Sequence, residues 1–290
     1  MIWEGAAYHF PGVMQMTCAW KELLDIIPGK LAQQIDTFGK EKLLELRLRK
    51  DSPAELVLTD RVVRIGHRLT RQELEQCVNS ASRYSPWTSA TASKGFITAP
   101  GGHRIGLCGE AVVKDGAITA IKDLRSLCIR VARDIPGVCG SAEKFEGSVL
   151  ILGAPGWGKT TLLRDLARSI SSKHNVGVID ERSELFPEGF LPGCRMDILT
   201  GCPKVQGIEM MLRTMSPEYI AVDEITAQED TVAILKAYGC GVRLLATAHA
   251  DSLDSYRARV TYRPLTERKV FDTAVVLRSD RSFTAERIQK

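Results

Sequence analysis

Short apolar runs that alternate with helical patterns dominate the second half of the chain. Five of these runs have the length of a buried strand, and they lie at residues 149–152, 176–179, 219–222, 242–247 and 273–277. Continuous apolar strands joined by helices predict a parallel sheet that is covered on both faces. We expect helices near residues 162–170, 208–215 and 231–238 to provide this cover.

The first half of the chain has a different pattern, in which apolar and polar residues alternate. Leucines at 44, 46 and 48 alternate with charged residues, which is the period of a half-buried strand. Val57 and residues 62–65 continue this sheet. A helical pattern begins near Trp20, and a second helix is predicted from Thr70, where Glu73 completes a capping box, to near Tyr84.

Glycine pairs and a proline divide the rest of this half. Residues 96–113 indicate a hairpin broken by Gly101-Gly102, Asp115-Gly116 supplies another tight turn, and residues 129–132 form the last strand. Pro136-Gly137 is typical of a boundary between domains. We therefore expect a leader of uncertain order at residues 1–20, an N-terminal α+β domain at 21–136 and an α/β domain at 137–290.

Composition narrows the class of protein. A charged fraction of 26% and a net charge of +4 are those of a folded protein, and the dispersed Lys and Arg give weak support for a nucleic-acid surface. The eight cysteines form no C-x-x-C pair, so we interpret them as small buried hydrophobic residues. With no secretory signal and no apolar run of ~20 residues, we expect a cytoplasmic protein that reaches a membrane only through partners.

The clearest motif directly follows the strand at 149–152. It matches G-x-x-x-x-G-K-[ST], and a helix comes after it, as this motif requires. Backbone N–H groups of the loop and the helix N-terminus are expected to bind the phosphates of ATP, Lys159 to reach the β- and γ-phosphates, and Thr160 to hold Mg²⁺. The predicted nucleotide-binding residues are Gly153, Ala154, Pro155, Gly156, Trp157, Gly158, Lys159, Thr160 and Thr161.

Two acids end the apolar strand at 219–222, which is the form expected of a Walker B element. Asp223 is predicted to bind Mg²⁺ through water, and Glu224 to polarise the water that attacks ATP. An alternative is that both acids merely favour the start of a helix.

Further polar residues follow two other predicted strands at the same carboxyl edge of the sheet, where ligands bind in such folds. Glu181 is a candidate acid that supports the site, although a solvated strand end or a salt bridge with Arg182 is an alternative. His249 can contact the γ-phosphate or relay the nucleotide state, or it can be purely structural.

These segments together resemble the stage III sporulation protein AA family, which in turn looks like the ATPases of type II and type IV secretion systems. The resemblance rests on the P-loop, on residues 180–182, 216–224 and 246–250, and on residues 45–49 and 101–106 of the N-terminal half. It implies a RecA-like P-loop NTPase core and a hexameric ring with nucleotide between subunits. It also places Glu181 at the acidic box and His249 at the histidine box of these ATPases.

The resemblance further implies that Arg104 and Arg130 supply arginines to the nucleotide, although sheet arginines often just cover their own strand. We therefore expect an ATP-hydrolysing motor that serves the channel between mother cell and forespore. Its expected partners are other copies of itself and channel membrane proteins such as stage III sporulation protein AB. The alternatives are a nucleic-acid-dependent NTPase and a nucleotide-gated regulatory module, but the composition favours no nucleic-acid partner.

Overall fold

The computed structural model of the chain describes residues 17–82, 95–140, 145, 147–187 and 189–288. Within these residues the chain forms two compact units. Of the described residues, the P-loop unit comprises those within 135–186 and 191–288. The N-terminal unit comprises those within 17–134, together with residues 187, 189 and 190. The predicted leader and the predicted helix end near Tyr84 lie largely or wholly outside the described residues.

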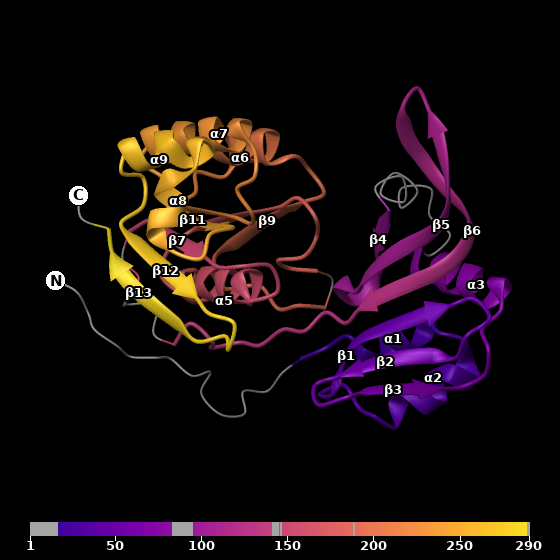
Figure 1. Cartoon of the computed structure of the whole chain (residues 1–290). Helices are drawn as coiled ribbons and strands as arrows, with labels where there is room; N and C mark the ends of the chain where they lie inside the picture. Colours follow the sequence, from indigo (N-terminus) through magenta and orange to yellow (C-terminus); the bar gives the residue numbers. More distant parts are fainter. Residues whose placement is uncertain (1–16, 83–94, 141–144, 146, 188, 289–290) are drawn as a thin grey trace. The chain divides into compact units, whose positions relative to one another are not determined.

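The P-loop unit is built on a sheet that, in the described residues, has the strand order β13-β12-β7-β11-β10-β8-β9 (Figure 1). Neighbouring strands from β12 to β9 are parallel, and β13 pairs antiparallel with β12 at one edge. The strands are β7 (Val149–Leu152), β8 (Val176–Asp180), β9 (Met196–Thr200), β10 (Tyr219–Val222), β11 (Arg243–Ala248), β12 (Thr273–Leu277) and β13 (Phe283–Arg287).

Helices cover both faces of this sheet, which explains why its central strands are apolar throughout. Figure 1 shows α5 on one face and α6, α7 and α9 on the other. Val149 and Ile151 of β7 pack with α5, whereas Leu150 and Leu152 pack with α6 and α7. The helices are α5 (Lys159–Ile170), α6 (Lys204–Thr214), α7 (Gln228–Gly239), α8 (Leu253–Ala258) and α9 (Arg263–Glu267).

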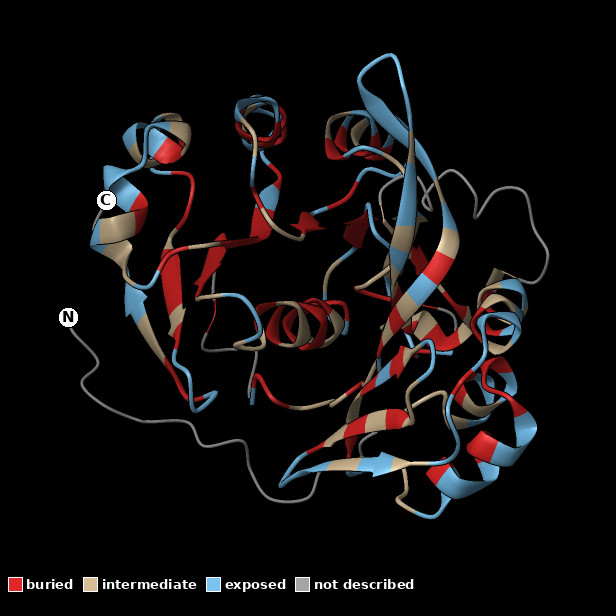
Figure 2. Cartoon of the chain, turned by 45° about the vertical axis from the view of Figure 1, so that its right-hand side comes forward, coloured by how far each residue is buried: buried red, intermediate tan, exposed pale blue. Residues whose placement is uncertain are grey.

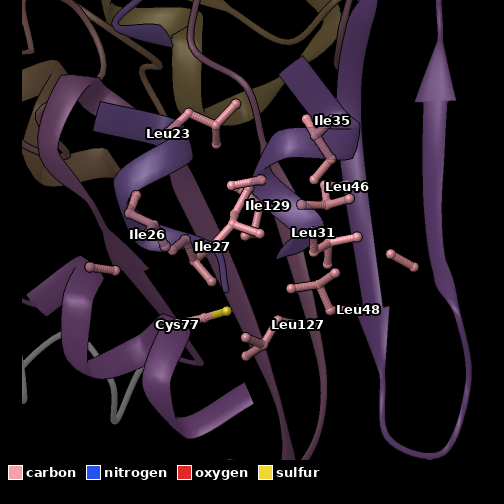
Figure 3. Close-up of a cluster of buried hydrophobic side chains, with 14 of the residues drawn as sticks. Leu23, Ile26, Ile27, Leu31, Ile35, Leu46, Leu48, Cys77, Leu127 and Ile129 are labelled. Atoms are coloured by element: carbon pink, nitrogen blue, oxygen red, sulfur yellow. The ribbon is translucent and has the colours of Figure 1, made fainter. Parts of the chain in front are cut away.

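The N-terminal unit contains a sheet whose described strands are all antiparallel, in the order β3-β2-β1-β6-β5-β4. Its helices pack on one face, where they enclose a core of Leu23, Leu31, Leu46, Leu48 and Ile129 (Figure 3). The elements are α1 (Trp20–Ile26), α2 (Gly29–Asp36), β1 (Leu43–Arg49), β2 (Ala54–Leu58), β3 (Val62–Ile65), α3 (Arg71–Ser82), β4 (Phe96–Thr98), β5 (Arg104–Lys114) and β6 (Ala117–Arg130).

The predicted capping box of α3 is present. The Thr70 N–H donates to Glu73 Oε2 over 2.8 Å, and the Glu73 N–H donates to Thr70 Oγ1 over 3.3 Å. Burial works to raise the pKa of Glu73, but these hydrogen bonds and His67 outweigh it and lower the pKa. Local chemistry thus fixes the start of this helix as the sequence indicates.

The last strand was predicted at residues 129–132, but β6 begins much earlier, at Ala117, and ends at Arg130. The predicted start is therefore wrong. The outer part of β6 pairs only with β5, and this part of the hairpin is exposed on both faces (Figure 2). Asp115 and Gly116 form the turn with φ angles of 52° and 76°. Exposure on both faces removes the apolar alternation by which a strand is recognised.

The expectation that all cysteines are buried is also wrong. Cys77 and Cys139 are buried, but Cys108, Cys194 and Cys240 are exposed. Among the described residues, no helix is long and apolar enough to cross a bilayer.

Candidate functional site

The P-loop joins β7 to α5, and two of its glycines have positive φ. Gly156 has a φ of 80° and Gly158 a φ of 99°, a region that glycine enters without steric cost. These two residues turn the chain so that α5 begins at Lys159. Because the N–H groups of the first helical turn lack partners within the helix, they are available to an anion.

Lys159 is 7% exposed, and its ammonium contacts the P-loop backbone. Nζ donates to the carbonyl oxygens of Gly153 and Ala154 over 2.8 and 3.0 Å, and to His249 Nδ1 over 3.1 Å. Burial lowers the pKa of Lys159, while the charges of Asp223 and Glu224 oppose this effect.

His249 connects Lys159 to Glu224. An ammonium can only donate, so His249 Nδ1 accepts from Lys159 and the ring proton sits on Nε2. Nε2 then donates to Glu224 Oε1 over 2.8 Å. The three side chains form one hydrogen-bonded chain from the P-loop to the end of β10.

Asp223 lies between two threonine hydroxyls. Thr160 Oγ1 donates to Asp223 Oδ2 over 2.7 Å, and Thr247 Oγ1 donates to Oδ1 over 2.6 Å. The Thr247 hydroxyl also accepts the backbone N–H of Glu224 over 2.8 Å. Thr247 therefore positions both acids.

Glu224 has a backbone φ of 53°, which is costly for a residue with a side chain. Its second oxygen, Oε2, accepts from Arg182 Nη1 over 2.6 Å. Burial raises the pKa of Glu224, but the hydrogen bond from His249 and the charge of Arg182 outweigh it, so the pKa lies below its usual value. The carboxylate is therefore ionised at neutral pH.

Glu181 lies at the same edge of the sheet, at the end of β8. It pairs with Lys204 Nζ over 2.6 Å and not with Arg182, so the salt bridge considered from the sequence is wrong. Lys204 is 6% exposed and stands at the first residue of α6, 3.7 Å from Asp230 Oδ2. A small cleft is lined by Glu181, Lys204, Asp223 and Glu224 together with Asp180, Arg182 and Glu184.

Asp180 organises the loop after β8. It is 2% exposed and accepts the backbone N–H groups of Glu184, Leu185 and Phe186 over 2.8 to 2.9 Å. Burial raises the pKa of Asp180 more than these three donors lower it. This acid holds the loop that carries Glu181 and Arg182.

The remaining predicted P-loop residues differ in exposure. Pro155 and Gly156 are exposed, and Thr161 is half-buried in the first turn of α5. Trp157 lines a hollow of about 470 Å³, together with Arg257 and other residues of 251–257, residues of β12 and β13, and Arg278 just after β12. This hollow has the size of a small-molecule site.

Arg104 and Arg130 both belong to the N-terminal unit. They are cross-strand partners on β5 and β6. The Arg104 guanidinium lies 4.1 Å from the centroid of the Phe96 ring, and Arg130 Nε is 3.8 Å from Glu45 Oε2. Their described contacts are therefore with their own sheet.

Sequence reasoning missed Thr247, Arg182 and Lys204 as members of the site. Thr247 and Arg182 lie next to or near predicted site residues at strand ends, and this position in the sequence could have indicated their role. Lys204 lies outside every motif, and only the fold brings it to Glu181.

Comparison with known proteins identifies the family. Residues 21–287 match the family described as "Sporulation stage III, protein AA". The chain is 35% identical over 273 residues to stage III sporulation protein AA of Bacillus subtilis (strain 168), which covers 87% of this chain and 88% of that protein.

Solved structures share the fold at low sequence identity. The Legionella pneumophila ATPase DotB aligns with a TM-score of 0.58 and 18% identity, covering 90% of this chain and 80% of that chain. The pilus retraction motor PilT aligns with a TM-score of 0.60 and 13% identity, covering 87% and 80%. The architecture is thus the RecA-like P-loop fold predicted from the sequence, and the chain belongs to the stage III sporulation protein AA family.

Proposed function

We propose that this chain hydrolyses ATP in the presence of Mg²⁺ and uses the energy as a motor. The observation that carries the proposal is the hydrogen-bonded chain from Lys159 through His249 to Glu224, which joins a phosphate-binding loop to a candidate base. The family's fold relation to the ATPases DotB and PilT supports it.

The P-loop unit offers a place for each part of the nucleotide. The loop at 153–158 and the first turn of α5 suit the phosphates, with Lys159 moving from loop carbonyls to phosphate oxygens. The adjoining hollow beside Trp157 has room for the nucleoside. We expect both parts to be needed for tight binding.

The donor set beside Lys159 fits Mg²⁺. Thr160 Oγ1 and Asp223 Oδ2 are already 2.7 Å apart, and Mg²⁺ in nucleotide sites is held by one or two such oxygens plus phosphates and water. Bound there, the ion would neutralise charge that develops on the phosphates. Thr247 keeps Asp223 in place for this role.

Glu224 is our candidate for the general base. Its carboxylate would take a proton from the water whose oxygen attacks the γ-phosphorus, as the bond to the β–γ bridging oxygen breaks. The positive φ of this residue and the hydrogen bond of its N–H to Thr247 hold the side chain in one direction. Glu181 supports the site through Lys204.

We further propose a hexameric ring in which Arg104 and Arg130 reach the nucleotide of a neighbouring subunit. Arginine at the γ-phosphate stabilises transition-state charge. The name of the Bacillus subtilis relative suggests a role in sporulation. We infer that the ring acts in the cytoplasm and powers assembly of, or transport through, the channel between mother cell and forespore, held there by membrane proteins such as stage III sporulation protein AB.

Steady-state phosphate release by the purified chain tests this proposal. We expect turnover with ATP and Mg²⁺, loss of turnover with EDTA, a specific activity that rises with protein concentration, and stimulation by membranes that contain the channel proteins. Nearly unchanged turnover with single-stranded DNA is also expected, since the described surface has no stacking platform of several aromatic residues. A large, salt-sensitive stimulation by DNA would instead favour a nucleic-acid-dependent NTPase.

A further inference from the structure

On the face of the N-terminal sheet opposite the described helices, arginines stand in register across the strands. One row runs Arg64, Glu55, Arg47, Cys128, Gly106 and Phe96, from β3 to β4. The next row runs Val62, Val57, Glu45, Arg130, Arg104 and Thr98, and a third contains Arg49, Ser126 and Cys108. We call the surface made by these three rows the arginine face.

Positive charge is in excess on the arginine face. Glu45 contacts both Arg47 and Arg130, and Glu55 contacts both Arg49 and Arg64. Two carboxylates are thus shared among four arginines. The side chain of Arg49 stays 43% exposed and that of Arg64 72% exposed. Every cation in these rows is arginine and none is lysine, which favours forked recognition of carboxylates over general solvation.

A hollow of about 340 Å³ opens in the middle of this face. Its lining includes Arg47, Arg49, Ser126 and Cys128, and Gly106 forms part of its floor. The guanidinium groups and the Ser126 hydroxyl supply hydrogen-bond donors. Because Gly106 has no side chain, space remains above the sheet at this position. The hollow therefore suits an anionic group.

The packing of the described residues does not explain why residue 106 is glycine. Among them, a Cβ at Gly106 would come no closer than 3.8 Å to its nearest neighbours, and the φ of Gly106 is not positive. Glycine within a strand costs about 0.5–1 kcal/mol relative to alanine, and it often marks a place where a ligand approaches closely. At this position the missing side chain keeps the hollow open.

We propose that the part of the arginine face around Arg47 and Arg49 binds an extended acidic segment of a partner polypeptide, with one carboxylate seated in the hollow over Gly106. The row that holds Arg104 and Arg130 is left to the nucleotide role proposed above. The row from β3 to β5 spans four strand spacings, about 19 Å, which matches about six residues of extended chain. A single-stranded nucleic acid is less suited, because the one aromatic ring in these rows, Phe96, is covered by Arg104. This proposal does not depend on ATP hydrolysis.

Fluorescence anisotropy with a labelled eight-residue peptide of alternating Glu and Ser tests it, with a Gln and Ser peptide as the control. We expect the Glu peptide to bind at least about ten-fold more tightly. Gly106→Val should fill the hollow and lower affinity about ten-fold without changing charge. The double variant Arg47→Gln/Arg49→Gln, at exposed positions, should do the same, whereas Arg61→Gln in the β2–β3 turn should not.

Two exposed thiols provide a second readout. The Glu peptide should slow alkylation of Cys108, which lies on the arginine face, and leave that of Cys240 unchanged. Equal binding of the two peptides, or wild-type affinity in the double arginine variant, would overturn the proposal. An oligo-dT strand that binds more tightly than the Glu peptide, and that the same variants weaken, would replace it with nucleic-acid binding.

Discussion

The parallel sheet of the P-loop unit is covered by helices on both faces, whereas the described helices of the N-terminal unit pack on one face of its antiparallel sheet. At the carboxyl edge of the first sheet, Lys159, Asp223, Glu224 and His249 meet. The second sheet presents Arg104 and Arg130 on a broad face.

This difference separates two kinds of functional residue. At the sheet edge, hydrogen bonds join Lys159 to His249 and His249 to Glu224, and another joins Thr160 to Asp223, so the geometry is fixed within one unit. On the arginine face, the arginines contact carboxylates of neighbouring strands, and we propose that they serve another molecule. We therefore expect changes at the edge to act within a subunit and changes on the face to act between molecules.

The largest expected effect comes from Lys159→Ala. It removes the ammonium that would meet the β- and γ-phosphates, and we expect ATP affinity to fall by on the order of 10³ or more. Isothermal titration with ATP measures this, and Lys236→Ala, an exposed cation paired with Glu209, is the control. Unchanged affinity in a folded Lys159→Ala variant would contradict the P-loop assignment.

The next largest effect is expected from removing an arginine that acts between subunits, which should lower the rate of ATP hydrolysis by on the order of 10³. Arg104→Ala subunits keep an intact P-loop, and Lys159→Ala subunits keep intact arginines. Neither should turn over alone, but a mixture should recover part of the activity. If the mixture co-assembles and stays inactive, and Arg130→Ala behaves likewise, both arginines are structural.

The cores of the two units provide a third test. Leu46 is fully buried in the N-terminal unit, and Leu46→Ala should lower the free energy of unfolding by about 2–5 kcal/mol. Denaturant unfolding measures this, with the exposed Val62→Ala as a control. We expect ATP affinity at 10 °C to stay unchanged, since the nucleotide site lies in the other unit. A loss of ATP affinity together with the loss of stability would mean that the two units are coupled.

The smallest effect concerns pH. Because Arg182 helps to lower the pKa of Glu224, Arg182→Ala should raise that pKa and move the acidic limb of the pH–rate profile to higher pH. Arg213→Ala, on α6, should leave the limb in place. An unmoved limb in Arg182→Ala would mean that another group controls it.

Strands buried on both sides could be predicted closely from the sequence. The predicted bounds of β7, β10 and β12 match the structure, because a continuous apolar run ends where burial ends. The edge strands β9 and β13 were missed, since both carry polar residues and are only partly buried. Helix α2 was missed because it starts at a glycine after Pro28.

At the site, local motifs predicted which residues meet but not how they pair. The P-loop and the strand-end acids bring Thr160 to Asp223 and His249 to Glu224. The pairs Arg182–Glu224 and Glu181–Lys204 join loops that lie far apart in the sequence. Such pairs depend on strand order, which no single motif contains.

Rapid mixing of Glu224→Gln with radiolabelled ATP tests the central claim most directly, because it separates binding from hydrolysis. We predict that this variant binds ATP as tightly as the wild type and releases phosphate more slowly by about 10²-fold or more, since it loses its base but keeps Lys159 and Thr160. Wild-type turnover in Glu224→Gln would contradict the account and place the base elsewhere, with Glu181 as the next candidate.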